Sequence, residues 1–298
     1  MLNKSSFAPI PYHAQFFKAL VTPYRMVVLT LLEDFEDYNE YGKLDLEDVS
    51  RRGGAISLGV YHAKDDIKSC LQAIEMQQYF GVKNVKWHLL AEQETIDVML
   101  PQGKATLAHR KDKYNGLDGS DLVDLCWLSL FCEEVEDIHY LATLAEHPNT
   151  KWYSERSRIF FDIQLALFGV KATNVHERIQ QFVEYSTPEH LSELAFKHAN
   201  LIDLVNIDLM IKVFTGVSEE EYQQAMHQAV QSHHEYWSGK DVKEERDGFF
   251  SMPLLALAKF AYQKYGYRLG FETDYVPEPF YTQKMPEFSY LFLDKYKS

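Results

Sequence analysis

The chain has 298 residues, of which 46% are apolar and 25% charged, and this composition excludes an intrinsically disordered protein. Its net charge of -14 disfavours direct nucleic-acid binding, because affinity for phosphates depends on Lys and Arg. Three cysteines without a CxxC pair are no disulfide framework and are typical of a reducing compartment, so we expect a cytoplasmic protein.

The N-terminal part of the chain predicts helices followed by a hairpin. Thr22-Pro23 is typical of an N-cap and a first-turn proline, which predicts a helix that begins there. Residues 44–80 predict two helices with Gly53-Gly54 as the break. Residues 94–110 contain two β-tolerant runs around Pro101-Gln102-Gly103, and this pattern predicts a small β-hairpin.

The C-terminal part continues with helical patterns. The turn cluster 114–121 leads into a single long helix predicted from about Ser120 to Glu146, and Gly169 closes another over Trp152–Phe168. Thr187-Pro188 repeats the N-cap and proline signal. Ser218 and Glu221 form a capping box, which predicts a helix from there to about His234.

The most apolar stretch of the chain is residues 248–266. It is too short for a membrane span and is interrupted by Lys259, so it predicts a core helix between Pro253 and Gly266. We therefore expect a mainly α fold, a single large multi-helix array with a small hairpin near residues 94–110. The predicted organisation is one domain over residues 1–298, divisible into an N-terminal subdomain 1–115 and a helical subdomain 116–298.

The sharpest enzymatic candidate is the acidic run "EDFED", in which Glu33, Asp34 and Asp37 share a helix face that would suit magnesium and a diphosphate. The run resembles the first acidic motif of terpene-synthase-like enzymes. Residues 65–73 begin like the second motif but place Ala73 where the final acid is needed. A solvated acidic helix end explains the run better, so the magnesium-dependent enzyme is the alternative hypothesis.

Other chemistry-bearing residues predict no catalytic or metal site. His227 and His234 lie seven residues apart, too far to share one ion, and His233 points to a different face from His234. Burial and nearby acids disfavour a reactive thiolate at Cys126 or Cys132. No nucleophile-elbow, Walker or dinucleotide motif occurs, so no cofactor is predicted.

The last third of the chain carries an ordered set of features. "HHEYW" at 233–237 closes one helix, "ERDGFFSMP" and the core helix "LLALAKFAYQKYG" follow, and an extended segment contains Tyr275-Val276-Pro277. This order resembles the immunity protein 49 family of bacterial polymorphic toxin systems. The segment 121–144, which includes Trp127, fits the family's central helix.

The resemblance implies an immunity protein that neutralises a cognate toxin by stoichiometric occlusion, with neither a cofactor nor a membrane. A helical scaffold without a toxin partner is the third hypothesis. Since some such toxins are basic nucleases, the two acidic runs are the candidate toxin contacts. These candidates are Glu33, Asp34, Glu36, Asp37 and Glu40 in the first run, and Glu133, Glu134, Glu136 and Asp137 in the second.

Overall fold

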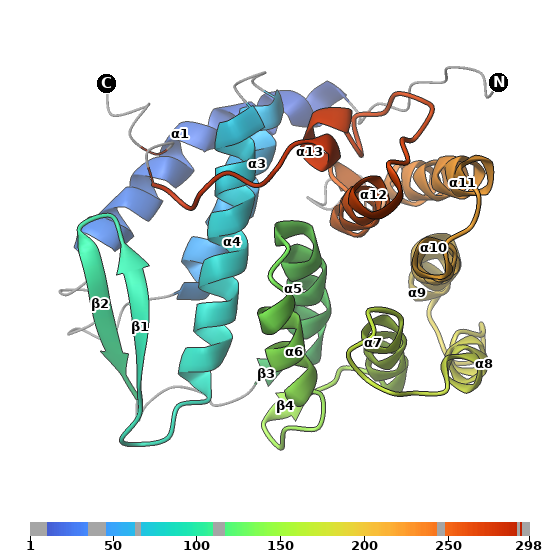
Figure 1. The fold of residues 1–298 in the computed structure, drawn as a ribbon, viewed down its shortest axis with the longest axis horizontal. Coiled ribbons are helices and arrows are strands. Elements are labelled where there is room, and N and C mark those ends of the chain that lie inside the picture. The colour runs from blue at the N-terminus through green and yellow to red at the C-terminus, as the bar shows by residue number, and fades with distance from the viewer. Residues whose placement is uncertain are drawn as a thin grey trace. The chain divides into compact units, whose positions relative to one another are not determined.

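The computed structural model describes residues 11–34, 46–62, 67–109, 117–242, 248–290 and 293. The described chain forms two compact units (Figure 1). The hairpin unit contains residues 11–117 and the chain from 285 onward, and the helical unit contains residues 118–284. The elements are mainly helices with short strands, which confirms the predicted fold class. The organisation as a single domain stays a prediction.

The hairpin unit is built from three helices and one antiparallel strand pair among its described residues. These are α1 (Pro11–Glu33), α3 (Leu46–His62), α4 (Ile67–His88), β1 (Thr95–Leu100) and β2 (Gly103–Ala108). Helix α3 packs against both α1 and α4, and β1 packs on α4. The strands pair from Thr95 opposite Ala108 to Leu100 opposite Gly103, which confirms the predicted hairpin.

Gly53 and Gly54 lie inside α3, so the predicted helix break is wrong. A Cβ on Gly53 would lie 3.1 Å from the Ala73 carbonyl oxygen, and one on Gly54 would lie 2.6 Å from the Gln77 side chain. Both neighbours belong to α4. The glycines therefore allow two helix backbones to approach closely, and they do not end the helix.

Helix α1 begins at Pro11, and the predicted start at Thr22 is also wrong. Pro23 lies inside the helix, where it removes one backbone donor without ending the element. A first-turn proline and an interior proline look alike in a local pattern. The two cases differ in whether the residues before the proline are themselves helical, as they are in α1.

The C-terminal end of the chain returns to the hairpin unit and covers the edge of β1. The Tyr290 hydroxyl donates to the Met99 carbonyl at 2.5 Å, and the Met99 amide donates to the Tyr79 hydroxyl at 2.7 Å. The Phe288 ring lies 5.0 Å from the Tyr79 ring, and Leu293 is fully buried. Both backbone polar groups of Met99 are thus satisfied by tyrosines, which protects an otherwise open strand edge.

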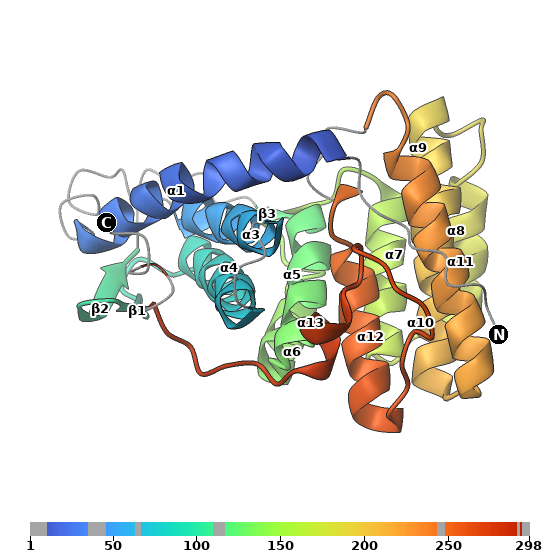
Figure 2. The same cartoon turned by 90° about the horizontal axis from the view of Figure 1, so that it is seen from above.

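The helical unit contains the remaining helices, and several of them run side by side (Figure 2). These are α5 (Gly119–Cys132), α6 (Val135–Thr143), α7 (Glu155–Leu167), α8 (Val175–Tyr185), α9 (Glu193–His198), the π-helix η1 (Ala199–Asp203), α10 (Leu204–Thr215), α11 (Glu219–Trp237), α12 (Met252–Tyr265) and α13 (Glu278–Thr282). The short strands β3 (Leu117–Asp118) and β4 (Thr150–Lys151) pair with each other.

Helix α12 is the core helix that the apolar stretch predicts. It packs against α5, α10 and α13, and its residues from Leu254 to Lys259 are all buried. Pro253 stands in its first turn, and Gly266 ends it with a φ of 77°. A helix that is apolar nearly all round needs neighbours on several sides, and α12 has them.

The predicted caps are partly confirmed. Ser218 and Glu221 make the capping box, and α11 extends to Trp237, three residues beyond the predicted end. Gly169 follows α7 with a φ of 76°, as predicted. Thr187 starts no helix; its carbonyl accepts from His190 in a single turn, and α9 begins later behind a different N-cap, Ser192.

Candidate functional site

The second acidic run lies at a sharp break between α5 and α6, which we call the acidic corner (residues 133–137). Glu133 has a φ of 68°, a left-handed conformation that disfavours residues other than glycine. Its amide donates to the Leu130 carbonyl, and the Glu134 amide donates to the Ser129 carbonyl at 2.9 Å. The single helix predicted over 120–146 is therefore wrong, because these bonds close α5 at Cys132.

A buried lysine links the acidic corner to the core. Lys259 is 1% exposed, and its Nζ lies 2.9 Å from Glu133 Oε1 and 2.8 Å from the Phe131 carbonyl oxygen. Burial acts to raise the pKa of Glu133, but the hydrogen bond and charge of Lys259 and a hydrogen bond from Gln263 hold it below its ordinary value. Glu133 thus neutralises a core cation, and its backbone strain is offset by that pairing.

The other members of the corner are presented outward. Glu134, Val135 and Glu136 are exposed, and Val135 keeps 56% of its surface accessible. Glu136 and Asp137 stand in the first turn of α6, where the positive end of the helix dipole favours carboxylates. The corner therefore combines an exposed apolar side chain with carboxylates on a fixed backbone.

The first acidic run is only partly described. Glu33 ends α1 and Asp34 follows it; both are exposed, and the Asp34 amide donates to the Thr30 carbonyl at 2.9 Å. Glu36, Asp37 and Glu40 lie outside the described residues. The described members of this run belong to the hairpin unit, whereas the acidic corner belongs to the helical unit.

The histidines of α11 are packing and hydrogen-bonding residues in the structure. His233 is buried, and desolvation, followed by repulsion from His234 and His198, lowers its pKa to about 3. His234 shares a 2.8 Å hydrogen bond with the Tyr275 hydroxyl. Within the described ranges, no three His, Cys, Asp or Glu side chains are arranged to hold a metal ion.

The cysteines occupy the core. Cys70, Cys126 and Cys132 are buried, and none of the three is part of a disulfide. Burial raises the pKa of the Cys126 thiol, so its thiolate is strongly disfavoured. This finding agrees with the packing role predicted from the sequence.

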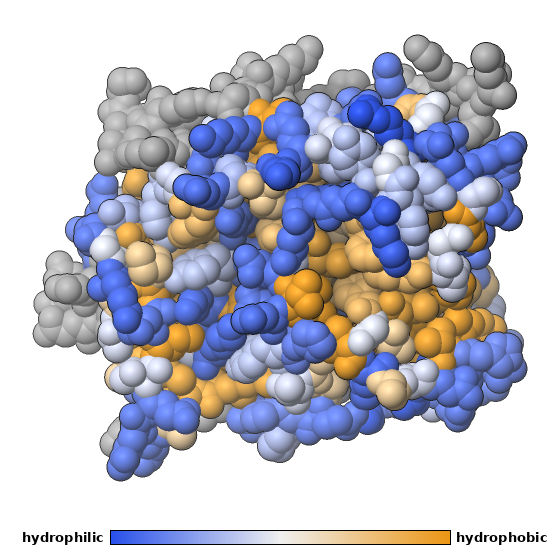
Figure 3. Space-filling model, in the orientation of Figure 1, coloured by the Kyte–Doolittle hydropathy of each residue, from blue (hydrophilic) through white to orange (hydrophobic). Residues whose placement is uncertain are grey.

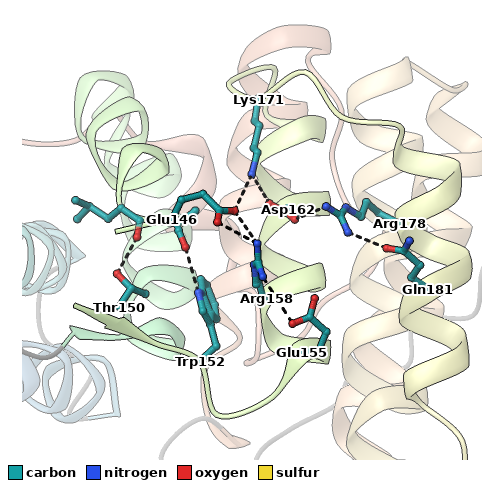
Figure 4. A network of polar contacts seen from close by, with 11 residues as sticks. Glu146, Thr150, Trp152, Glu155, Arg158, Asp162, Lys171, Arg178 and Gln181 are labelled. Atoms are coloured by element: carbon teal, nitrogen blue, oxygen red, sulfur yellow. Dashed lines mark hydrogen bonds and ion pairs between the residues drawn. The ribbon is translucent and has the colours of Figure 1, made fainter. Parts of the chain in front are cut away.

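An ion-pair network in the helical unit was not anticipated from the sequence. Asp162 is 2% exposed, and Lys171 and Arg178 reach its two carboxylate oxygens from two sides at 2.7 and 3.2 Å (Figure 4). Arg158 donates to both oxygens of Glu146 at 2.9 and 3.0 Å. The network ties α7 to α8 and to the end of the α6 segment. An acid inside the apolar run "IFFDIQLAL" was the available signal.

The fold defines a mainly α-helical protein with exposed acidic residues at the ends of α1 and α5 and in the first turn of α6. Among the described helices, none is both long and apolar enough to cross a bilayer. The chain belongs to the immunity protein 49 family, whose model matches residues 91–280. This match confirms the resemblance and extends it from the core helix back to the hairpin. Neither the curated proteins nor the solved structures contain a match to the chain.

Proposed function

We propose that the protein binds a cognate toxin and neutralises it by stoichiometric occlusion in the cytoplasm. Membership of the immunity protein 49 family over residues 91–280 is the observation that carries this proposal. Occlusion needs a rigid surface, since binding free energy is lost when loops must be ordered. The acidic corner supplies such a surface, because Lys259 fixes its backbone from within the core.

The test is a rescue experiment combined with a measurement of stoichiometry. A tagged copy is used to capture the toxin from its own source cells, and the captured toxin is then expressed with and without this protein. We expect growth only in the presence of the protein, and a one-to-one complex by light scattering. Capture of several unrelated host proteins, with no rescue of growth, would favour a scaffold.

We further propose that the acidic corner contacts basic residues of the toxin. Glu134, Glu136 and Asp137 would speed association through long-range attraction, and this effect weakens with salt. The variant Glu134→Lys, Glu136→Lys, Asp137→Lys should slow association by roughly tenfold or more at low salt.

The matched control reverses three exposed acids elsewhere in the helical unit, Glu184, Glu189 and Glu235. It produces the same change in net charge without touching the corner. Equal slowing in both triple variants would show that only net charge matters. The described acids Glu33 and Asp34 are tested in the same way, by the double reversal Glu33→Lys, Asp34→Lys.

A further inference from the structure

Three phenylalanine rings form a continuous row across three helices of the helical unit. Phe168 caps the end of α7, Phe214 lies in the last turn of α10, and Phe260 lies in the second half of α12. The centroids of Phe168 and Phe214 are 5.3 Å apart, and those of Phe214 and Phe260 are 4.5 Å apart. We call this set the phenylalanine row.

The row rests on the core but keeps part of its surface in solvent. Trp127 of α5 is 2% exposed and touches the Phe168 ring edge-on at 5.4 Å. Each of the three phenylalanines is half-buried. Figure 3 shows an apolar area on this face, over the ends of α7 and α10. A contiguous apolar area on a protein this acidic is more informative than scattered apolar residues.

Phe260 is one of three half-buried aromatic residues on α12, with Tyr262 and Tyr265. Its neighbours Lys259 and Ala261 are at most 1% exposed, whereas Phe260 is not buried. Of these three rings, Phe260 is the one that packs against Phe214 of α10, at 4.5 Å between centroids. An aromatic ring loses little conformational entropy when it binds, since only two side-chain torsions are fixed. Rings that already pack against each other from neighbouring helices lose still less.

The acidic corner borders this row. Glu133 is hydrogen-bonded to Lys259 and Gln263, and these residues flank Phe260 by one position before and three positions after in α12. Residues three apart on a helix are neighbours on its surface. On another side, Lys264 Nζ lies 5.2 Å from the centroid of the Phe260 ring. The row therefore has an apolar centre and a charged rim, the arrangement of protein–protein interfaces.

We infer that Phe168, Phe214 and Phe260 form the apolar centre of the surface that binds the toxin. This inference rests on the proposed function and extends it from charge to a specific contact area. The partner that fits has an apolar contact area and basic residues at the border that faces Glu134 and Glu136. Buried aromatic anchors carry most of the binding free energy in such interfaces, while rim charges chiefly set the association rate.

The first test substitutes the central ring and uses the purified, catalytically inactive toxin obtained in the capture experiment. Phe214→Ser should weaken binding at least about thirtyfold, and Phe214→Leu by about fivefold to tenfold, because the leucine keeps apolar volume but loses the ring–ring contacts. Leu194→Ser is the matched control, since Leu194 is 42% exposed on α9 and lies outside the row. The control should bind within about twofold of the wild type.

The second test needs no substitution and so does not depend on whether a variant folds. Hydrogen–deuterium exchange of the unsubstituted protein with and without the toxin should show protection in residues 164–170, 210–216 and 257–264. Protection confined to other segments would overturn the inference, as would unchanged affinity of Phe214→Ser in a folded state. Dimers of the free protein that Phe214→Ser dissociates would also overturn it, by assigning the row to a second copy.

The two proposals fail differently. If the wild type neutralises no toxin, the proposed function itself is wrong, and the inference falls with it. If the wild type neutralises the toxin and the row shows neither protection nor sensitivity to substitution, only the inference is wrong.

Discussion

The ammonium group of Lys259 lies 2.9 Å from the Glu133 carboxylate and joins the core helix to the acidic corner. One partner is 1% exposed and the other 47%, so the pair spans the boundary between core and solvent. The same ammonium donates to the carbonyl of Phe131, near the end of α5. A single cation therefore fixes both the end of a helix and the backbone that follows it.

Lys259→Met should destabilise the fold by about 1–3 kcal/mol. The substitution leaves the buried Phe131 carbonyl without its donor, while Glu133 remains partly solvated and limits the loss. Urea unfolding measures the effect. Lys264→Met, at an exposed position of the same helix, should change the unfolding free energy by less than about 0.5 kcal/mol. Similar losses in both variants would contradict the role assigned to Lys259.

Asp162→Asn should destabilise the protein by about 1–3 kcal/mol. The amide keeps the size of the side chain but removes the buried charge that Lys171 and Arg178 approach. The control is Asp208→Asn, whose partner is Lys212 in an exposed pair on α10 that should contribute less than about 1 kcal/mol. Urea unfolding at two salt concentrations tests both. If salt reduced the loss of unfolding free energy in Asp162→Asn more than in Asp208→Asn, the Asp162 pair would not be shielded from solvent.

His233 should make the protein less stable in acid. Burial, with repulsion from His234 and His198, lowers its pKa to about 3, so the folded state binds fewer protons than the unfolded state below the ordinary value of about 6.5. The contribution of neutral His233 to the free energy of unfolding is fully present above that pH. It is lost at about 1.4 kcal/mol per pH unit as the pH falls toward 3.

The comparison that isolates His233 is His233→Gln, which retains a polar side chain but does not titrate. Between pH 6.5 and 5 the wild type should lose about 2 kcal/mol more unfolding free energy than the variant. Other titrating groups cancel in this difference. Identical pH profiles would show that His233 is already accessible to protons in the folded state.

Gly119→Ala should destabilise the start of α5. A Cβ at this position would lie 2.3 Å from the Trp152 ring, so the indole would have to move. We expect a loss of about 1–3 kcal/mol in urea unfolding. In a double-mutant cycle with Trp152→Leu, the combined loss should be smaller than the sum of the two. If the two losses were fully additive, the destabilisation by Gly119→Ala would not come from the contact with Trp152.

Local sequence signals determined the elements that depend only on nearby residues. The capping box at Ser218, the glycine ends at Gly169 and Gly266, and the hairpin around Gly103 all follow from backbone preferences that neighbouring residues set. The apolar pattern of residues 248–266 determined that α12 is a core helix, because such a surface must be covered. The ordered features of the last third were enough to suggest the family.

The tertiary structure decided what depends on partners distant in the chain. Gly53 and Gly54 belong inside a helix because α4 lies against them, and no local pattern reveals that neighbour. Glu133 follows α5 in a left-handed conformation and pairs with Lys259, which lies 126 residues later and which no local pattern reveals. The phenylalanine row arises only when α7, α10 and α12 assemble, since its rings come from segments that are far apart in the sequence. Helical patterns and the ordered features of the last third thus predicted the fold class and the family, whereas packing between distant segments brings together the residues of the candidate binding surface.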